Sequence, residues 1–147
     1  MISVVLDANI IISGIIGFRN PDSIPGTILR LWRKGIFTLI TSKHIRDEVK
    51  DTLHKPYFIA HMNSQEISRI QALLRFEAKQ MLIIENISDI ATHPEDDLVI
   101  SVAVSSKADY LVTGDKPLLR KVSKYKGVKL ISPNDFLELL KRQIKIG

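Results

Sequence analysis

The first nine residues constrain the fold more than any other stretch of the chain. Ile2 to Leu6 is a short apolar run rich in β-branched side chains, and the polar residues Asp7 and Asn9 follow it. Such a run is typical of a strand that is buried on both faces of a parallel sheet. A carboxylate directly after that strand stands at its carboxyl end, the edge where open α/β sheets bind ligands. The plainer interpretation is that Asp7 only caps the next helix, since aspartate is a favoured N-cap.

The rest of the chain alternates apolar strands with amphipathic helices. We expect further strands at 36–41, 81–84, 110–112 and 128–131, and helices at 8–16, 27–34, 42–53, 64–80, after the polar loop 89–97, and from 133 onward. Three strands end in a hydroxyl that leads toward a helix, at Thr41, Thr113 and Ser132. This alternation predicts an α/β fold of three layers, α/β/α, around a mostly parallel sheet of five strands. At 147 residues the chain is expected to form a single domain spanning 1–147.

Composition excludes several classes of protein. There is no cysteine, which rules out disulfides and thiolate metal sites. No stretch approaches the roughly 20 apolar residues of a membrane span, and the apolar start has no basic leader, so we expect a cytoplasmic protein. The net charge of +5 suits a polyanionic substrate around an acidic site, but a modest positive charge also simply aids solubility.

Four acids stand out among the sixteen in the chain because of where they fall: Asp7, Glu48, Asp97 and Asp115. Asp7 and Asp115 follow strands, and the other two lie early in helices that follow a strand and loop. In a parallel sheet all these positions lie toward one edge. Clustered carboxylates raise one another's pKa, and a divalent cation removes that penalty. Oxygen ligands suit Mg²⁺ or Mn²⁺, and either ion activates water for phosphodiester hydrolysis.

In these residues the chain resembles the PIN domain, a metal-dependent nuclease fold used by many toxin ribonucleases. The resemblance rests on Val5–Asn9, on Glu48, and on the runs 95–103 and 108–119, and it spans essentially the whole chain. It is most similar to the branch of toxin components from toxin–antitoxin systems. Single-strand or structured RNA is the substrate that this resemblance implies.

Carried over by position, the resemblance makes Asp7, Glu48 and Asp97 the core metal ligands and Asp115 the more variable fourth acid. Asn9 would support Asp7, and Thr113 would be the hydroxyl at the end of the fourth strand. A slip of one residue would exchange Asp97 for Asp96; the spacing to Thr113 and Asp115 favours Asp97. The implied chemistry is in-line attack of an activated water at phosphorus, without a covalent enzyme intermediate.

Three cationic or imidazole side chains lie near the acids in sequence: Lys43, His44 and Lys116. Each is a candidate for a phosphate contact, although each alone is more typical of a solvated surface residue. No histidine has a partner at zinc-ligand spacing. The apolar sides of 27–34 and 64–80 exceed what one small core needs, and we expect a homodimer or an antitoxin to cover the remainder.

Two other readings compete with the ribonuclease. The first is a PIN-like RNA-binding or assembly module without turnover, which an assay of Asp7→Asn beside the wild type would separate. The second is a phospho-acceptor signalling domain. That class needs paired acids after the first strand, an acceptor aspartate after the third and a lysine after the fifth, and the chain offers none of these.

Overall fold

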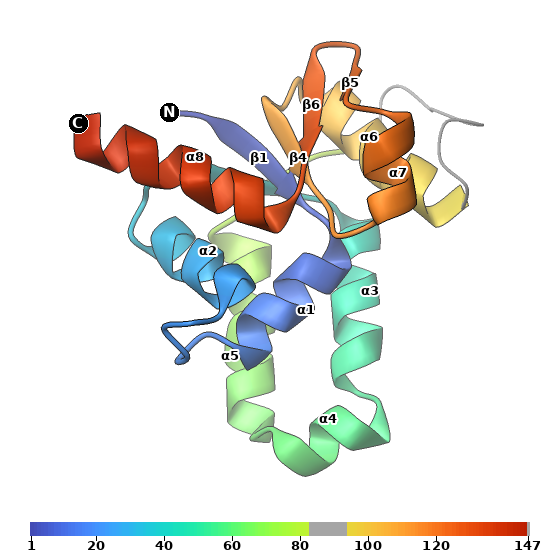
Figure 1. Ribbon diagram of the computed structural model, residues 1–147. Helices are drawn as coiled ribbons and strands as arrows, with labels where there is room; N and C mark the ends of the chain where they lie inside the picture. The colour runs from blue at the N-terminus through green and yellow to red at the C-terminus, as the bar shows by residue number, and fades with distance from the viewer. Residues whose placement is uncertain (83–93, 147) are drawn as a thin grey trace.

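A twisted sheet of six strands forms the centre of the computed structural model, which describes residues 1–82 and 94–146 (Figure 1). The strand order is β3-β2-β1-β4-β6-β5. The strands are β1 (Ser3–Leu6), β2 (Thr38–Thr41), β3 (Lys79–Gln80), β4 (Tyr110–Val112), β5 (Lys124–Tyr125) and β6 (Val128–Ile131). The predicted α/β fold is confirmed, but the predicted number of five strands is wrong. The additional strand, β5, has two residues and no apolar run for sequence reasoning to detect.

All neighbouring strands are parallel except β5 and β6, which form an antiparallel hairpin. In the register of the sheet Val5 lies beside Ile40 of β2, and Leu6 lies beside Val112 of β4. The carboxyl ends of the three central strands are therefore level with one another. Residues that follow β1, β2 and β4 emerge at one edge of the sheet, as the sequence predicts.

The third strand lies two residues earlier than we expect from the sequence. Helix α5 (Ser64–Phe76) ends before residue 80, and β3 pairs with β2 through Lys79 and Gln80. The Gln80 side-chain amide donates hydrogen bonds to the carbonyls of Leu74 (2.8 Å) and Ala78 (3.1 Å), which fixes the chain as it leaves the helix. Of the predicted strand 81–84, residues 81 and 82 are not in a strand, and 83 and 84 lie outside the described residues.

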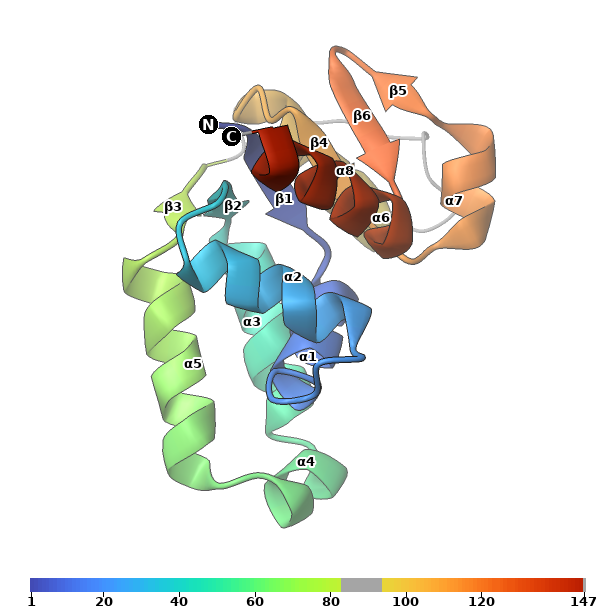
Figure 2. The same cartoon turned by 60° about the vertical axis from the view of Figure 1, so that its left-hand side comes forward.

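The other helices are α1 (Ala8–Ile16), α2 (Ile24–Arg33), α3 (Lys43–Leu53), α4 (Pro56–His61), α6 (Pro94–Ser105), α7 (Lys116–Lys121) and α8 (Pro133–Ile146). Helix α6 packs on β1 and β4, while α8 and α2 pack together on the opposite face, as Figures 1 and 2 show. On that face the Phe136 ring lies 5.4 Å from the Phe37 ring and 6.0 Å from the Tyr110 ring, centroid to centroid. This arrangement gives the three predicted layers.

Two short helices and one helix start differ from the sequence prediction. Helices α4 and α7 have six residues each, too few to show a periodic apolar face. Helix α2 begins at Ile24 rather than 27, because the Ser23 hydroxyl accepts a hydrogen bond from the Gly26 amide at 3.0 Å. A Cβ atom on Gly26 would collide with the carbonyl of Gly17, so this loop closes only around a glycine.

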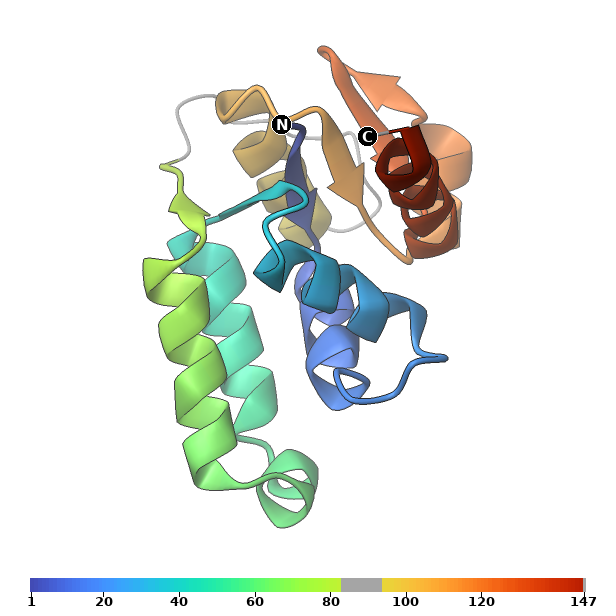
Figure 3. The same cartoon turned by 90° about the vertical axis from the view of Figure 1, so that its left-hand side faces the viewer.

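Helices α3, α4 and α5 form an arm that extends away from the sheet, with α3 and α5 side by side and α4 joining their far ends (Figure 3). Val49 and Leu53 of α3 are fully buried, and Ile67 and Leu74 of α5 are nearly so. The apolar stripe predicted for α3 is thus part of the core. No helix within residues 1–82 and 94–146 is long and apolar enough to cross a membrane.

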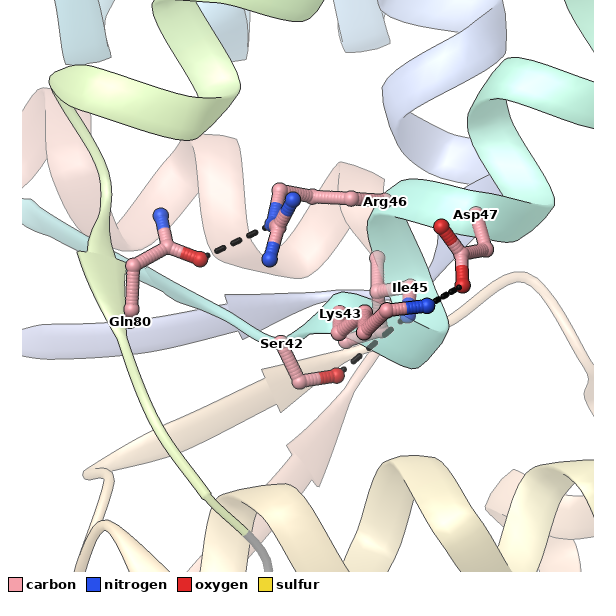
Figure 4. A network of polar contacts seen from close by, with 6 residues as sticks. All are labelled: Ser42, Lys43, Ile45, Arg46, Asp47 and Gln80. Atoms are coloured by element: carbon pink, nitrogen blue, oxygen red, sulfur yellow. Dashed lines mark hydrogen bonds and ion pairs between the residues drawn. The ribbon is translucent and has the colours of Figure 1, made fainter.

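A small polar network fixes the start of the arm against the edge of the sheet (Figure 4). The Ser42 hydroxyl caps α3 by accepting a hydrogen bond from the Ile45 amide at 3.3 Å. One turn along, Arg46 Nε donates to Gln80 Oε1 at 2.9 Å. Because Gln80 also binds the end of α5, the network holds α3, α5 and β3 together and fixes the direction in which α3 leaves the sheet.

Candidate functional site

Asp7 lies at the junction of β1 and α1, at the carboxyl end of β1 and beside the end of β4. Its backbone amide donates to the carbonyl of Val112 at 3.0 Å, which extends the pairing of β1 and β4 by one residue. Its carboxylate Oδ1 accepts a hydrogen bond from the Asn9 amide at 3.3 Å and so caps α1. The capping role considered for Asp7 is therefore real, and it occupies only one carboxylate oxygen.

Thr113 connects Asp7 to the segment that follows β4. Its buried hydroxyl donates to Asp7 Oδ2 at 3.1 Å and accepts a hydrogen bond from the Asp115 amide, also at 3.1 Å. Asp115 in turn caps α7, since its Oδ1 accepts from the Leu118 amide at 3.1 Å. One hydroxyl thus joins the ends of two neighbouring strands and brings Asp7 and Asp115 into the same region.

The electrostatics of Asp7 reflect this position. Burial raises the pKa of the Asp7 carboxyl group above its ordinary value, and the nearby charge of Asp115 raises it further. Hydrogen bonds from Asn9, Thr113 and Ala8 act in the opposite direction and do not cancel the effect of burial. The ionised form of Asp7 is therefore held at a free-energy cost in the folded protein, which a nearby cation would offset.

Asp97 lies in the first turns of α6, the helix that packs on β1 and β4. Only 7% of the residue is exposed, which makes it one of few buried charged residues in the described part of the chain. Ser101, one turn later, donates its hydroxyl to the Asp97 carbonyl at 2.8 Å. The neighbouring Asp96 is half-buried, so the residue favoured by sequence spacing is also the more enclosed of the two.

Glu48 lies on α3, in the second turn after β2 ends. Its Oε1 lies 3.0 Å from Nε2 of His44, one turn earlier on the same helix. Both side chains are about one-third exposed, so they lie at the border of the core, as expected for Glu48 from its angle to the buried stripe. His44 therefore contacts the candidate ligand Glu48 and is not an isolated surface residue.

The remaining candidates are more exposed. Asn9 reaches Asp7 through its backbone amide, and its side chain is exposed, so this hydrogen bond does not use the asparagine side-chain amide. Lys43 is exposed and pairs with Asp47 at 2.8 Å. Lys116, the first residue of α7, is exposed and directly follows Asp115.

A metal site made of three or more ligands is not formed by the described residues. Among the side chains of residues 1–82 and 96–144, no group of three histidine, aspartate or glutamate residues is arranged to hold a metal ion. The structure brings Asp7 and Asp115 together through Thr113, whereas Glu48 and Asp97 lie in the early turns of α3 and α6. The donor chemistry still fits Mg²⁺, which is commonly held by one or two carboxylates, retained waters and substrate phosphates.

Sequence reasoning predicts the position of Thr113 at the end of a strand but not its role as a bridge between Asp7 and Asp115. The hydroxyls that end three strands have three different fates. The Thr113 hydroxyl bridges the Asp7 carboxylate and the Asp115 amide. The Ser132 hydroxyl caps α8 by accepting from the Asp135 amide at 3.1 Å. Thr41 is fully buried, and its hydroxyl has no partner among the described residues. The repeated pattern of strand and hydroxyl predicts all three positions, but only the register of β1 and β4 separates the bridge from the cap.

Comparison with known proteins agrees with this architecture. No curated protein matches the chain. The family described as PIN domain matches residues 3–117, from the start of β1 through the first turn of α7. That match covers most of the chain and all four candidate acids, so the chain belongs to the PIN-domain family.

Proposed function

We propose that this protein is a metal-dependent endoribonuclease that hydrolyses RNA phosphodiester bonds and acts as the toxin of a toxin–antitoxin pair. PIN domains are generally nucleases, and family membership supports the reaction class. The observation that carries the proposal is the Asp7–Thr113–Asp115 connection, which places two acids and a buried hydroxyl at the carboxyl edge of a parallel sheet.

Mg²⁺ or Mn²⁺ would be held chiefly by Asp7 and Asp97, with Glu48 and Asp115 completing the site or holding a second ion. The bound cation would supply an activated water and would neutralise charge that develops on the phosphate. Thr113 keeps one oxygen of Asp7 oriented, and the α1 cap fixes the other. His44 lies against the Glu48 carboxylate, with Nε2 3.0 Å from Oε1. Water adds at phosphorus, the ester bond to the leaving oxygen breaks, and the proton released by water ends on the leaving group.

The raised pKa of Asp7 gives this proposal a chemical basis. Burial disfavours the ionised form of the Asp7 carboxyl group. A bound cation favours that ionised form, because its charge removes the penalty of burial. Where the pH is low enough for Asp7 to remain protonated in the folded protein, metal loading should release a proton, and it should become tighter as the pH rises through that range.

Cleavage of labelled RNA by purified protein in Mg²⁺ or Mn²⁺, beside the Asp7→Asn variant, tests the proposal. We expect cleavage by the wild type that chelation with EDTA abolishes and that Asp7→Asn lacks. RNA binding without any cleavage in either metal would instead identify a PIN module without turnover.

The toxin role requires a protein partner, and the arm offers a surface for one. A cavity of about 440 Å³ lies among α1, α2, α4 and α5 and is lined mainly by apolar side chains. Ile16 and Tyr57, in its wall, are 59% and 64% exposed. Arg33 and Arg69 also line it, beside the pair of Arg19 and Glu66, and these two arginines favour an antitoxin segment with apolar residues flanked by acids. Light scattering of the protein alone would reveal a homodimer if a second copy covers this surface instead.

A further inference from the structure

A strongly basic surface of the molecule lies mostly beyond the residues matched to the family. Residues 116–129 contain six basic side chains and no acidic one. They are Lys116, Arg120, Lys121, Lys124, Lys126 and Lys129, which we call the basic segment. The whole chain has 21 basic and 16 acidic residues, so setting these six aside leaves 15 basic against 16 acidic. The entire positive excess of the protein is therefore concentrated in one segment, almost all of it past residue 117 where the family match ends.

The structure exposes every one of these side chains. The segment comprises α7 and the β5–β6 hairpin, which lie together at one end of the sheet (Figure 1). All six basic residues are exposed to solvent. Within the described part of the chain, no carboxylate forms an ion pair with Lys116, Arg120, Lys121, Lys124 or Lys129.

Two features of the hairpin indicate that its lysines occupy positions that are unfavourable for the stability of the fold. Lys124 and Lys129 are directly opposite each other in the antiparallel pair, an arrangement in which like charges destabilise a sheet. At the turn, Lys126 has a φ of 47° and Gly127 a φ of 87°. A two-residue turn with both φ angles positive strongly favours asparagine, aspartate or glycine at its first position, not lysine.

The segment is also continuous with the candidate active site. Asp115 caps α7 and is linked through Thr113 to Asp7, so the first basic residue, Lys116, directly follows a candidate metal ligand. From there the cations follow α7 and then the hairpin, whose turn lies toward the opposite edge of the sheet, because Lys129 is level with Tyr110 at the start of β4. A polyanion bound at the candidate metal ligands would meet Lys116 first, and it would meet the hairpin lysines only farther along the molecule.

We propose that α7 and the β5–β6 hairpin form the surface that binds the phosphate backbone of the RNA strand as it runs from the cleavage site past α7 toward the opposite edge of the sheet. The binding is electrostatic and independent of base sequence, since lysines on a hairpin neutralise phosphates without reading base edges. The identity of the polymer rests on the proposed function; the existence of a phosphate-binding surface does not.

The test measures binding of a fluorescent single-stranded RNA in EDTA, where no cleavage is expected, as a function of salt. The variant combines Lys124→Gln, Lys126→Asn and Lys129→Gln. We expect it to bind at least about tenfold more weakly, and the slope of log affinity against log salt to fall by about 2, because each lost phosphate contact on a single strand removes about 0.7.

A matched control removes three charges elsewhere: Lys34→Gln, Lys55→Gln and Arg142→Gln, all on exposed side chains. It should bind RNA with nearly the affinity and salt slope of the wild type. If the two triple variants weaken binding equally, only net charge matters and the proposal is wrong. Thermal unfolding of each variant shows whether the fold is intact, and asparagine at 126 should stabilise the hairpin rather than disrupt it.

Other outcomes would also overturn the proposal. Lysines on an edge strand can serve only to prevent edge-to-edge aggregation, and then the hairpin variant would self-associate with unchanged RNA affinity. Binding of anionic lipid vesicles in preference to RNA would identify a membrane surface instead. RNA bound through the segment but never cut in Mg²⁺ would refute the nuclease while leaving this surface standing. Normal RNA affinity in the hairpin variant would refute this surface and leave the proposed nuclease standing.

Discussion

The acidic edge, by which we mean the strand ends that carry Asp7 and Asp115, adjoins the basic segment in sequence. The two regions differ in burial and in how their polar groups are paired. At the acidic edge, Asp7 and Thr113 are largely enclosed, and each polar atom has a defined hydrogen-bond partner. In the basic segment the cations are exposed, and within the described residues carboxylates do not pair with five of the six. Fixed geometry suits chemistry at a single phosphorus atom, whereas exposed charge suits binding that tolerates many positions along a chain. We therefore expect changes at the acidic edge to alter mainly the cleavage rate, and changes in the basic segment to alter mainly the affinity for RNA.

The largest expected effect is on rate. Asp7→Asn should lower RNA cleavage at least about a hundredfold, since even partners one step removed from a metal ligand are worth up to about that much. RNA affinity in EDTA should change little, because the basic segment is intact. Asp109→Asn is the matched control: Asp109 binds the Ser3 amide at 2.9 Å at the opposite edge of the sheet. Equal loss of cleavage in both variants would contradict a catalytic role for Asp7.

The next effect is on stability in the presence of metal. At a free Mg²⁺ concentration about 100 times its Kd, the wild type should gain about 2.7 kcal/mol in free energy of unfolding. Asp7→Asn should gain much less. Thermal unfolding with and without Mg²⁺ measures both, and Ca²⁺ provides a second oxygen-seeking ion for comparison. Identical gains in the two proteins would place the metal elsewhere.

Removal of the bridging hydroxyl should have a similar but smaller effect. Thr113→Val leaves the Asp115 amide without its acceptor and Asp7 without a donor, which should cost about 1–3 kcal/mol of unfolding free energy. Thr113→Ser keeps the hydroxyl and should retain most of both stability and cleavage. Denaturant unfolding and cleavage rates, measured on the same preparations, distinguish the loss of the bridge from the loss of a methyl group.

Stability against pH tests the burial of Asp7 directly. Because the pKa of Asp7 is raised in the folded state above its ordinary value of 3.8, its contribution to stability is complete below that pH and is lost as the pH rises through the folded pKa. Asp7→Asn removes this loss, so its stability relative to the wild type should increase with pH in the absence of metal. A constant difference across that range would show that Asp7 is not perturbed.

The smallest effect belongs to the hairpin turn. Lys126→Asn alone should raise the free energy of unfolding by up to about 1 kcal/mol, since asparagine adopts positive φ more readily than lysine. The same change should lower RNA affinity slightly and leave the cleavage rate at saturating RNA unchanged. A variant that is more stable and binds more weakly would show that charge at this turn serves binding rather than folding.

Sequence reasoning predicts the α/β fold and the strand ends that carry Asp7 and Thr113, because apolar β-branched runs ending in polar residues are a strong local signal. It does not predict β5, whose two residues pair only because Gly127 and Lys126 reverse the chain. It also misplaces β3, whose position depends on where α5 ends and on the contacts of Gln80. Contacts set by tertiary packing, rather than by local periodicity, account for these differences.

For the site, sequence spacing predicts which acids lie at the edge but not how they are held. The contact between His44 and Glu48 follows from helical spacing, which the sequence shows. The bridge from Thr113 to Asp7 and Asp115 depends on the register of β1 against β4, which no local pattern encodes. The concentration of positive charge in residues 116–129 is visible in the sequence, but its exposure is a property of the folded chain.

The hydrogen bond between Thr113 and Asp7 joins residues 106 positions apart in the chain. During synthesis, the first of these residues leaves the ribosome long before the second, and the two cannot meet until β4 has inserted beside β1. A growing chain therefore holds an unfinished centre for most of its translation. If the proposed nuclease activity depends on this centre, it cannot appear before the chain has been synthesised through Thr113.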